Sequence, residues 1–126
     1  MIGLADTSLF IAWETGRQLR AAPPDAIAVS VITLGELRLG VLMADELEAR
    51  HRRLATLQLA SALEPLVIDQ LVAEHWALLV ASLHQQGKRM PINDSWIAAV
   101  AIANGMPVVT QDDDFDGVVG LEVLKL

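Results

Sequence analysis

Short apolar runs rich in β-forming residues alternate with helix-forming segments along this chain of 126 residues, and this alternation limits the possible folds. Strands separated by helices predict a parallel sheet that is covered by helices on both faces. The expected fold is therefore α/β, a three-layer α/β/α sandwich around a mostly parallel five-stranded sheet. The expected strands are Ile2–Ala5, Ile27–Ser30, Leu66–Ile68, Pro107–Thr110 and Leu121–Leu124.

The segments between these runs carry helical spacing and residues that start and stop helices. Asp6, Thr7 and Ser8 are residue types that cap helices, Asp69 is expected to cap a long helix closed by Gly87, and Asn93–Asp94 is expected to open the last one. The expected helices are Leu9–Trp13, Thr33–Leu42, Asp45–Leu63, Asp69–Gln86 and Trp96–Ala103.

Composition predicts one domain over residues 1–126, since 53% of the residues are hydrophobic and a chain of this size can bury a core. With no cysteine, the chain has no disulfide framework, zinc ribbon or thiol nucleophile. No signal peptide is recognisable at the N-terminus. The longest uncharged stretch, Ser95–Gln111, is shorter than the roughly 20 apolar residues of a membrane span. We therefore expect a soluble, cytoplasmic protein without a membrane partner.

The charge balance is acidic, with 9 Lys and Arg against 16 Asp and Glu and a formal net charge of −7. Proteins that bind nucleic acid non-specifically usually carry an excess of positive charge, so this is not the expected main task. A site-specific nuclease remains compatible with the balance, because divalent cations bound by clustered carboxylates would invert the local charge.

Several acidic residues fall where the chemistry of a parallel α/β sheet is expected, beyond the carboxyl ends of the strands. Asp6 ends the first strand, Asp112–Asp114 follows the fourth, Asp94 begins the helix that leads into that fourth strand, and Glu36 lies in the helix after the second. Each has a plainer interpretation. Asp6 and Asp94 could only cap helices, and Asp112–Asp114 could be a solvated acidic turn.

Glu36 is expected to lie on a buried or nearly buried helix face, because its helical neighbours are apolar or small. A buried carboxylate needs a partner, and Arg38 points about 200° away around the helix, which leaves an ion pair with another segment as the alternative to a metal site. If the acids do converge, their repulsion requires a cation, and all-oxygen ligation suits Mg²⁺ or Mn²⁺. The helical neighbours of Glu36 are Ile32, Leu39, Gly40 and Met43.

Other chemistries find little support in the sequence. The three histidines lack metal-ligand spacing, and there is no Gly-x-Ser-x-Gly, Walker A loop or Gly-x-Gly-x-x-Gly. The tryptophans lie on expected helices among apolar residues, which favours core or dimer contacts over base stacking. They are Trp13, Trp76 and Trp96.

Four blocks in register resemble the PIN-domain family and, more narrowly, the VapC toxins of bacterial toxin–antitoxin pairs. They begin at Asp6-Thr-Ser and continue with Ser30-Val-Ile-Thr-Leu-Gly-Glu36, Asn93-Asp94-Ser-Trp and Val109-Thr110-Gln-Asp112. The match covers the chain from Asp6 to the terminal Gly-Leu-Glu-Val. Such a resemblance implies a PIN-like fold and a Mg²⁺- or Mn²⁺-dependent endoribonuclease that hydrolyses RNA phosphodiester bonds.

The resemblance also implies site residues. The catalytic acids are expected to be Asp6, Glu36, Asp94 and Asp112, which with Asp114 would be the metal ligands. Thr110 would act as a hydroxyl ligand to water or phosphate. Arg38, in the arginine-rich region up to residue 53, is expected to contact a flanking phosphate of the substrate.

The expected partners are RNA and a cognate VapB-type antitoxin, with a homodimer and a hetero-oligomer as assemblies. Two alternatives to the nuclease remain. One is a receiver-like phosphoacceptor module, with Asp69 as the acceptor and Lys125 as the required lysine. The other is an inactive PIN-fold module that only binds its antitoxin.

Overall fold

A computed structural model describes residues 1–126, and its centre is a parallel sheet of four strands in the order β2-β1-β3-β4. Leu4 of β1 pairs with Val108 of β3, which pairs with Val123 of β4. Both central strands are therefore hydrogen-bonded on two sides. The strands are β1 (Ile2–Ala5), β2 (Ala26–Ala28), β3 (Val108–Thr110) and β4 (Val123–Lys125).

The strand expected over Leu66–Ile68 is absent, which corrects the expected five-stranded sheet to four strands. Leu66 makes a single bridge to Ser30, with its N–H donating to the Val29 carbonyl at 2.8 Å. The ladder stops there because Ser30 already caps the next helix, with its side chain accepting from the Thr33 N–H. No extended partner is left beyond Ser30.

Five helices connect and cover the strands. Asp6, Ser30 and Asp69 cap three of them through side-chain oxygens, as the sequence predicts for Asp69. The last helix begins at Ile92, earlier than expected, which places Asp94 in its first turn instead of at its cap. The helices are α1 (Thr7–Thr15), α2 (Val31–Leu42), α3 (Leu47–Ser61), α4 (Gln70–Gln85) and α5 (Ile92–Ala103).

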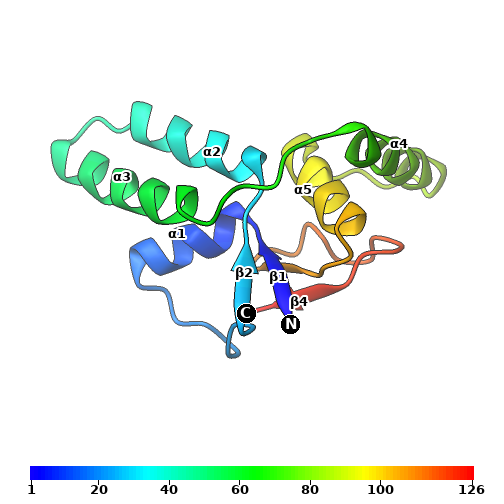
Figure 1. The fold of residues 1–126 in the computed structure, drawn as a ribbon, viewed down its shortest axis with the longest axis horizontal. Coiled ribbons are helices and arrows are strands. Elements are labelled where there is room, and N and C mark those ends of the chain that lie inside the picture. The colour runs from blue at the N-terminus through cyan, green and yellow to red at the C-terminus, as the bar shows by residue number, and fades with distance from the viewer.

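The two faces of the sheet bury separate hydrophobic clusters, because successive residues of a strand point to opposite sides. Leu4 and Val108 pack with α4 and α5, whereas Ala5 and Val109 pack with α1, α2 and α3. Figure 1 shows the two helical groups on opposite sides of the strands. The three-layer α/β/α arrangement expected from the sequence is confirmed. No helix combines the length and the apolar character needed to cross a membrane.

Gly3 lets β1 and β3 approach closely, because a Cβ at this position would collide with Cγ2 of Val109. We expect Gly3→Ala to lower the free energy of unfolding by about 1–3 kcal/mol through overpacking. Urea denaturation measures this as a lower midpoint at unchanged slope. Gly35→Ala is the control, since a Cβ there meets nothing within 4 Å and alanine favours a helix. An unchanged midpoint for Gly3→Ala would contradict the packing argument.

Candidate active site

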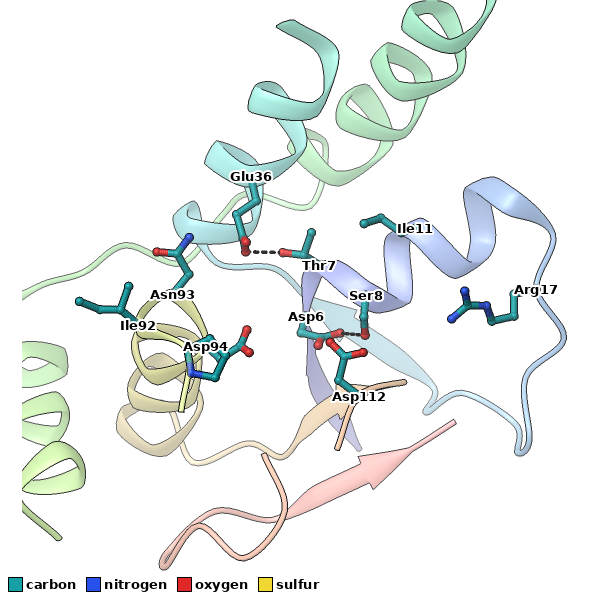
Figure 2. A pocket seen from close by; sticks show the side chains of 11 residues that line it. Asp6, Thr7, Ser8, Ile11, Arg17, Glu36, Ile92, Asn93, Asp94 and Asp112 are labelled. Carbon is teal, nitrogen blue, oxygen red and sulfur yellow. Dashed lines mark hydrogen bonds between the residues drawn. The ribbon is translucent and has the colours of Figure 1, made fainter. Parts of the chain in front are cut away.

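A polar cavity of about 490 Å³ opens beyond the carboxyl ends of β1 and β3, where the sequence places the acids. Four carboxylates from separate segments face it: Asp6, Glu36, Asp94 and Asp112 (Figure 2). The residues lining it are Asp6, Thr7, Ser8, Ile11, Arg17, Glu36, Pro91, Ile92, Asn93, Asp94 and Asp112.

Asp6 lies at the floor of this cavity, only 2% exposed, and each of its carboxylate oxygens accepts hydrogen bonds. Oδ1 accepts from the Leu9 N–H at 3.1 Å and from the Ser8 hydroxyl at 2.8 Å. Oδ2 accepts from the Thr110 hydroxyl at 2.6 Å. Asp6 therefore caps α1 and also lines the cavity with its carboxylate.

Glu36 reaches the cavity from the second turn of α2, where its Oε1 accepts a hydrogen bond from the Thr7 hydroxyl at 2.7 Å. It is half-buried, and no basic side chain pairs with it. The expectation of a buried helix face is wrong beyond this point, since Leu39 is 58% and Met43 68% exposed. The later turns of α2 pack on α3 through Leu37 and Val41, which leaves this side of the helix to solvent.

Asp94 and Asp112 approach the cavity from two further segments. Asp94 projects from the first turn of α5, and Asp112 follows β3, where its N–H donates to the Thr110 hydroxyl at 2.9 Å. Asp114 is exposed and does not line the cavity, although its charge acts on Asp94. Asp113 turns outward to accept from Lys125 Nζ at 2.6 Å. The acidic turn after β3 is thus divided between the cavity and the surface.

Burial and repulsion between charges make Asp6, Asp94 and Asp112 hard to ionise. Burial raises the pKa of Asp6 to about 6, an effect that hydrogen bonds from Thr110, Ser8 and Leu9 oppose and the Asp112 charge reinforces. Burial also raises the pKa of Asp94 to about 7, together with the charges of Asp114, Asp6 and Glu36. The pKa of Asp112 is raised by burial and by its acidic neighbours.

The two residues expected to contact the substrate lie in different places. Thr110 lies beside the acids, with no exposed surface, and its hydroxyl donates to Asp6, so it orients that carboxylate. Arg38 is exposed on α2 and does not line the cavity, because it lies on the side of the helix away from Glu36.

The sequence interpretation missed Arg17, which follows α1 and is the only cation lining the cavity. Its Nη1 donates to Gln111 Oε1 at 3.3 Å, and its charge lowers the pKa of Asp112. No motif in the sequence indicates a functional role for Arg17. Its position at the cavity depends on the turn at Gly16, which ends α1 with a left-handed backbone at φ of 70°.

The side chains at the cavity fit a hard divalent cation, because all of the acidic groups there are carboxylates with oxygen ligands. Arg17 is the one positively charged side chain at the cavity. No three acids lie close enough to form a closed cage around one ion. Mg²⁺ does not require such a cage, since it commonly keeps several waters and binds through one or two carboxylates and substrate phosphate. Asp6 and Asp94, which both line the cavity, could supply two such carboxylates.

The receiver-like alternative has no support at this site. Asp69 accepts the Val72 N–H at 2.9 Å as the cap of α4, and it does not line the acidic cavity. Lys125 is engaged by Asp113 and Asp116, each at 2.6 Å. Both residues that this interpretation requires therefore have structural roles.

The fold agrees with comparison to known proteins. A family model described as the PIN domain matches residues 4–121, and the chain belongs to this family.

Within the family, the chain is similar to VapC proteins of Mycobacterium tuberculosis. It is 52% identical to Ribonuclease VapC4 and 48% identical to Ribonuclease VapC5 from strain H37Rv, each over 98% of this chain and 95% of the relative. A crystal structure of VapBC-5, a member of the VapBC family of toxin–antitoxin systems from the same species, superposes with a TM-score of 0.90 at 46% identity. That alignment covers 99% of this chain and 98% of the other.

Proposed function

We propose that this chain is the toxin of a VapBC-type toxin–antitoxin pair, a Mg²⁺- or Mn²⁺-dependent endoribonuclease acting in the cytoplasm. The observation that carries the proposal is the meeting of Asp6, Glu36, Asp94 and Asp112 at one cavity. Relatives named as ribonucleases support the activity. A solved VapBC relative supports a VapB-type antitoxin as partner in a hetero-oligomer, and a homodimer of the toxin is part of the same proposal.

The acids divide the work by position. Asp6 and Asp94 hold the cation, and Glu36 and Asp112 bind it directly or through water, with Asp114 adding negative charge beside Asp94. When bound, a divalent cation lowers the pKa of a coordinated water and stabilises negative charge on a phosphate. One ion or two can serve that purpose.

Other residues prepare the carboxylates and the substrate. The Ser8 hydroxyl, the Leu9 N–H and the Thr110 hydroxyl fix both oxygens of Asp6 and leave one lone pair of Oδ2 for a cation. The Thr7 hydroxyl holds Glu36 in the same way. Arg17 offers a guanidinium to a phosphate of the RNA, a group that it can bind with two parallel hydrogen bonds.

The direct test is cleavage of a 5′-labelled RNA pool by the purified chain in Mg²⁺, Mn²⁺ or EDTA. We expect cleavage in either metal and none in EDTA, with products mapped by sequencing their 5′ ends. An Asp6→Asn chain purified in parallel controls for contaminating ribonuclease. An intact RNA pool in both metals, with a folded chain, would favour the inactive PIN-fold binding module.

Metal binding should depend on pH, because protons compete for Asp6 and Asp94. At about pH 6 most Asp94 carboxyls are protonated, given a pKa of about 7, and the proton must leave before the cation binds. We expect Mn²⁺ to bind about tenfold more weakly at pH 6 than at pH 8. Titration calorimetry in buffers of different ionisation enthalpy should show proton release at pH 6. An affinity that is constant across this range would contradict the assignment of these ligands.

A further inference from the structure

A second cavity, of about 260 Å³, lies beside the acidic one, between α4 and the start of α5. Ile92 lines both cavities, and Figure 2 shows it on the opposite side of the acids from Arg17. Trp76, Val80 and Leu83 form an apolar wall, and Lys88 and Arg89 stand at its rim.

Two of the polar side chains that line this cavity, Trp76 and Ser95, are hydrogen-bonded to each other, and the His84 imidazole lines it as well. The Trp76 Nε1–H donates to the Ser95 hydroxyl at 2.9 Å. One face of the Trp76 ring is covered by Trp96, with ring centroids 4.4 Å apart and the planes within 4°. An incoming group therefore meets apolar and aromatic surface, which suits an uncharged planar ring.

The rim carries positive charge without compensation. Lys88 and Arg89 are exposed, and neither has a carboxylate within ion-pair distance, in a chain whose net charge is −7. The ammonium of Lys88 lies 3.5 Å from the position a Cβ would take on Gly117, so it leans on the loop that carries Asp112.

We propose that this cavity is the subsite for the nucleotide next to the scissile phosphate, with the base against Trp76 and its phosphate at Lys88 and Arg89. A flat ring joined to an anion matches an apolar wall with a cationic rim, and an RNA strand that places one phosphate at the acids carries another one nucleotide away. This inference rests on the proposed nuclease function, but it assigns a new site to it.

The first experiment detects binding without catalysis. The ¹⁵N-labelled chain in EDTA is titrated with AMP, GMP, CMP or UMP at millimolar concentration, and the three indole N–H signals are followed after assignment by single Trp→Phe variants. We expect the Trp76 signal to shift with at least one nucleotide while that of Trp13, on the remote side of α1, stays in place. Inorganic phosphate alone should leave Trp76 unchanged.

Three results would overturn the subsite. They are no Trp76 shift with any nucleotide, the same shift with inorganic phosphate, or a shift only with an acidic peptide of alternating leucine and glutamate. The last would identify the cavity as a protein-binding site. None of them depends on whether the chain cleaves RNA, so the subsite and the proposed function can fail separately.

The second experiment measures cleavage of the labelled RNA pool in Mg²⁺. The double variant Lys88→Ala, Arg89→Ala should raise KM on the order of tenfold at nearly unchanged kcat, because a flanking phosphate contact is equal in the ground and transition states. Val80→Phe, which fills the cavity, should change the base preferred beside the cut. Arg50→Ala, an exposed arginine on α3, is the matched control. Unchanged KM and base preference with an active wild type would overturn the subsite and leave the nuclease intact.

Discussion

Asp94→Asn is expected to abolish RNA cleavage while leaving a folded and more stable protein. In the proposed mechanism the carboxylate of Asp94, with that of Asp6, holds the cation at the cavity, and asparagine cannot supply the negative charge that this requires. Loss of the several kcal/mol that a bound metal contributes corresponds to about a 1,000-fold fall in kcat/KM. Cleavage of a defined RNA under single-turnover conditions measures this fall.

The stability of Asp94→Asn separates loss of chemistry from loss of fold. The pKa of Asp94 is raised to about 7 in the fold, above the value of about 3.9 in an unfolded chain, so the folded state binds this proton more tightly. Wild-type stability must fall as pH rises between these values, and asparagine removes that loss. Because Asp94 is only half-buried, solvent screening limits the gain to on the order of 1 kcal/mol at pH 8. Calorimetry without metal should therefore give a higher Tm, and a lower one would contradict the electrostatic account.

Thr110→Val should lower cleavage by about 10–100-fold, the usual loss when a residue that orients a metal ligand is removed. The Thr110 hydroxyl donates to Oδ2 of Asp6 and accepts from the Asp112 N–H, and valine removes both hydrogen bonds, while Oδ1 of Asp6 keeps Ser8 and Leu9. The cost in stability is about 1–3 kcal/mol. Since the hydroxyl lowers the pKa of Asp6, its loss should also move the pH profile of cleavage toward higher pH.

Thr110→Ser provides the matched control, because serine keeps the hydroxyl and removes only a methyl group. We expect it to restore the wild-type pH profile, even where the missing methyl reduces stability. A valine variant with full activity, or an unshifted pH profile, would show that the contact with Asp6 has no part in metal binding.

The architecture was readable from the sequence because the signals for it are local. Apolar runs define β1 and β3, and Asp6 and Asp69 mark helix starts through their own side chains. The convergence of the acids also followed from local signals, since parallel strands end at one edge of the sheet. What failed depended on tertiary context. Leu66–Ile68 has the composition of a strand but lacks an extended partner.

Packing geometry accounts for the other differences. Thr110 ends β3 and is fully buried, so its hydroxyl reaches Asp6 and not the solvent. The apolar residues Leu39 and Met43 predict a buried face on the later turns of α2, but these side chains are exposed. Arg17 reaches the site only through the left-handed turn at Gly16. Each of these features depends on how distant segments are placed relative to one another, which a local sequence pattern does not show.

Because Asp6 both caps α1 and lines the acidic cavity, one substitution there can remove the activity and keep the fold. Asparagine starts helices as well as aspartate does, and its amide oxygen can still receive the Leu9 N–H, while the Thr110 hydroxyl can rotate to accept from the new NH₂ group. The Asp6→Asn variant would be an inactive protein with an unchanged outer surface. In a cell that makes both forms, the inactive variant and the active toxin would compete for the same antitoxin.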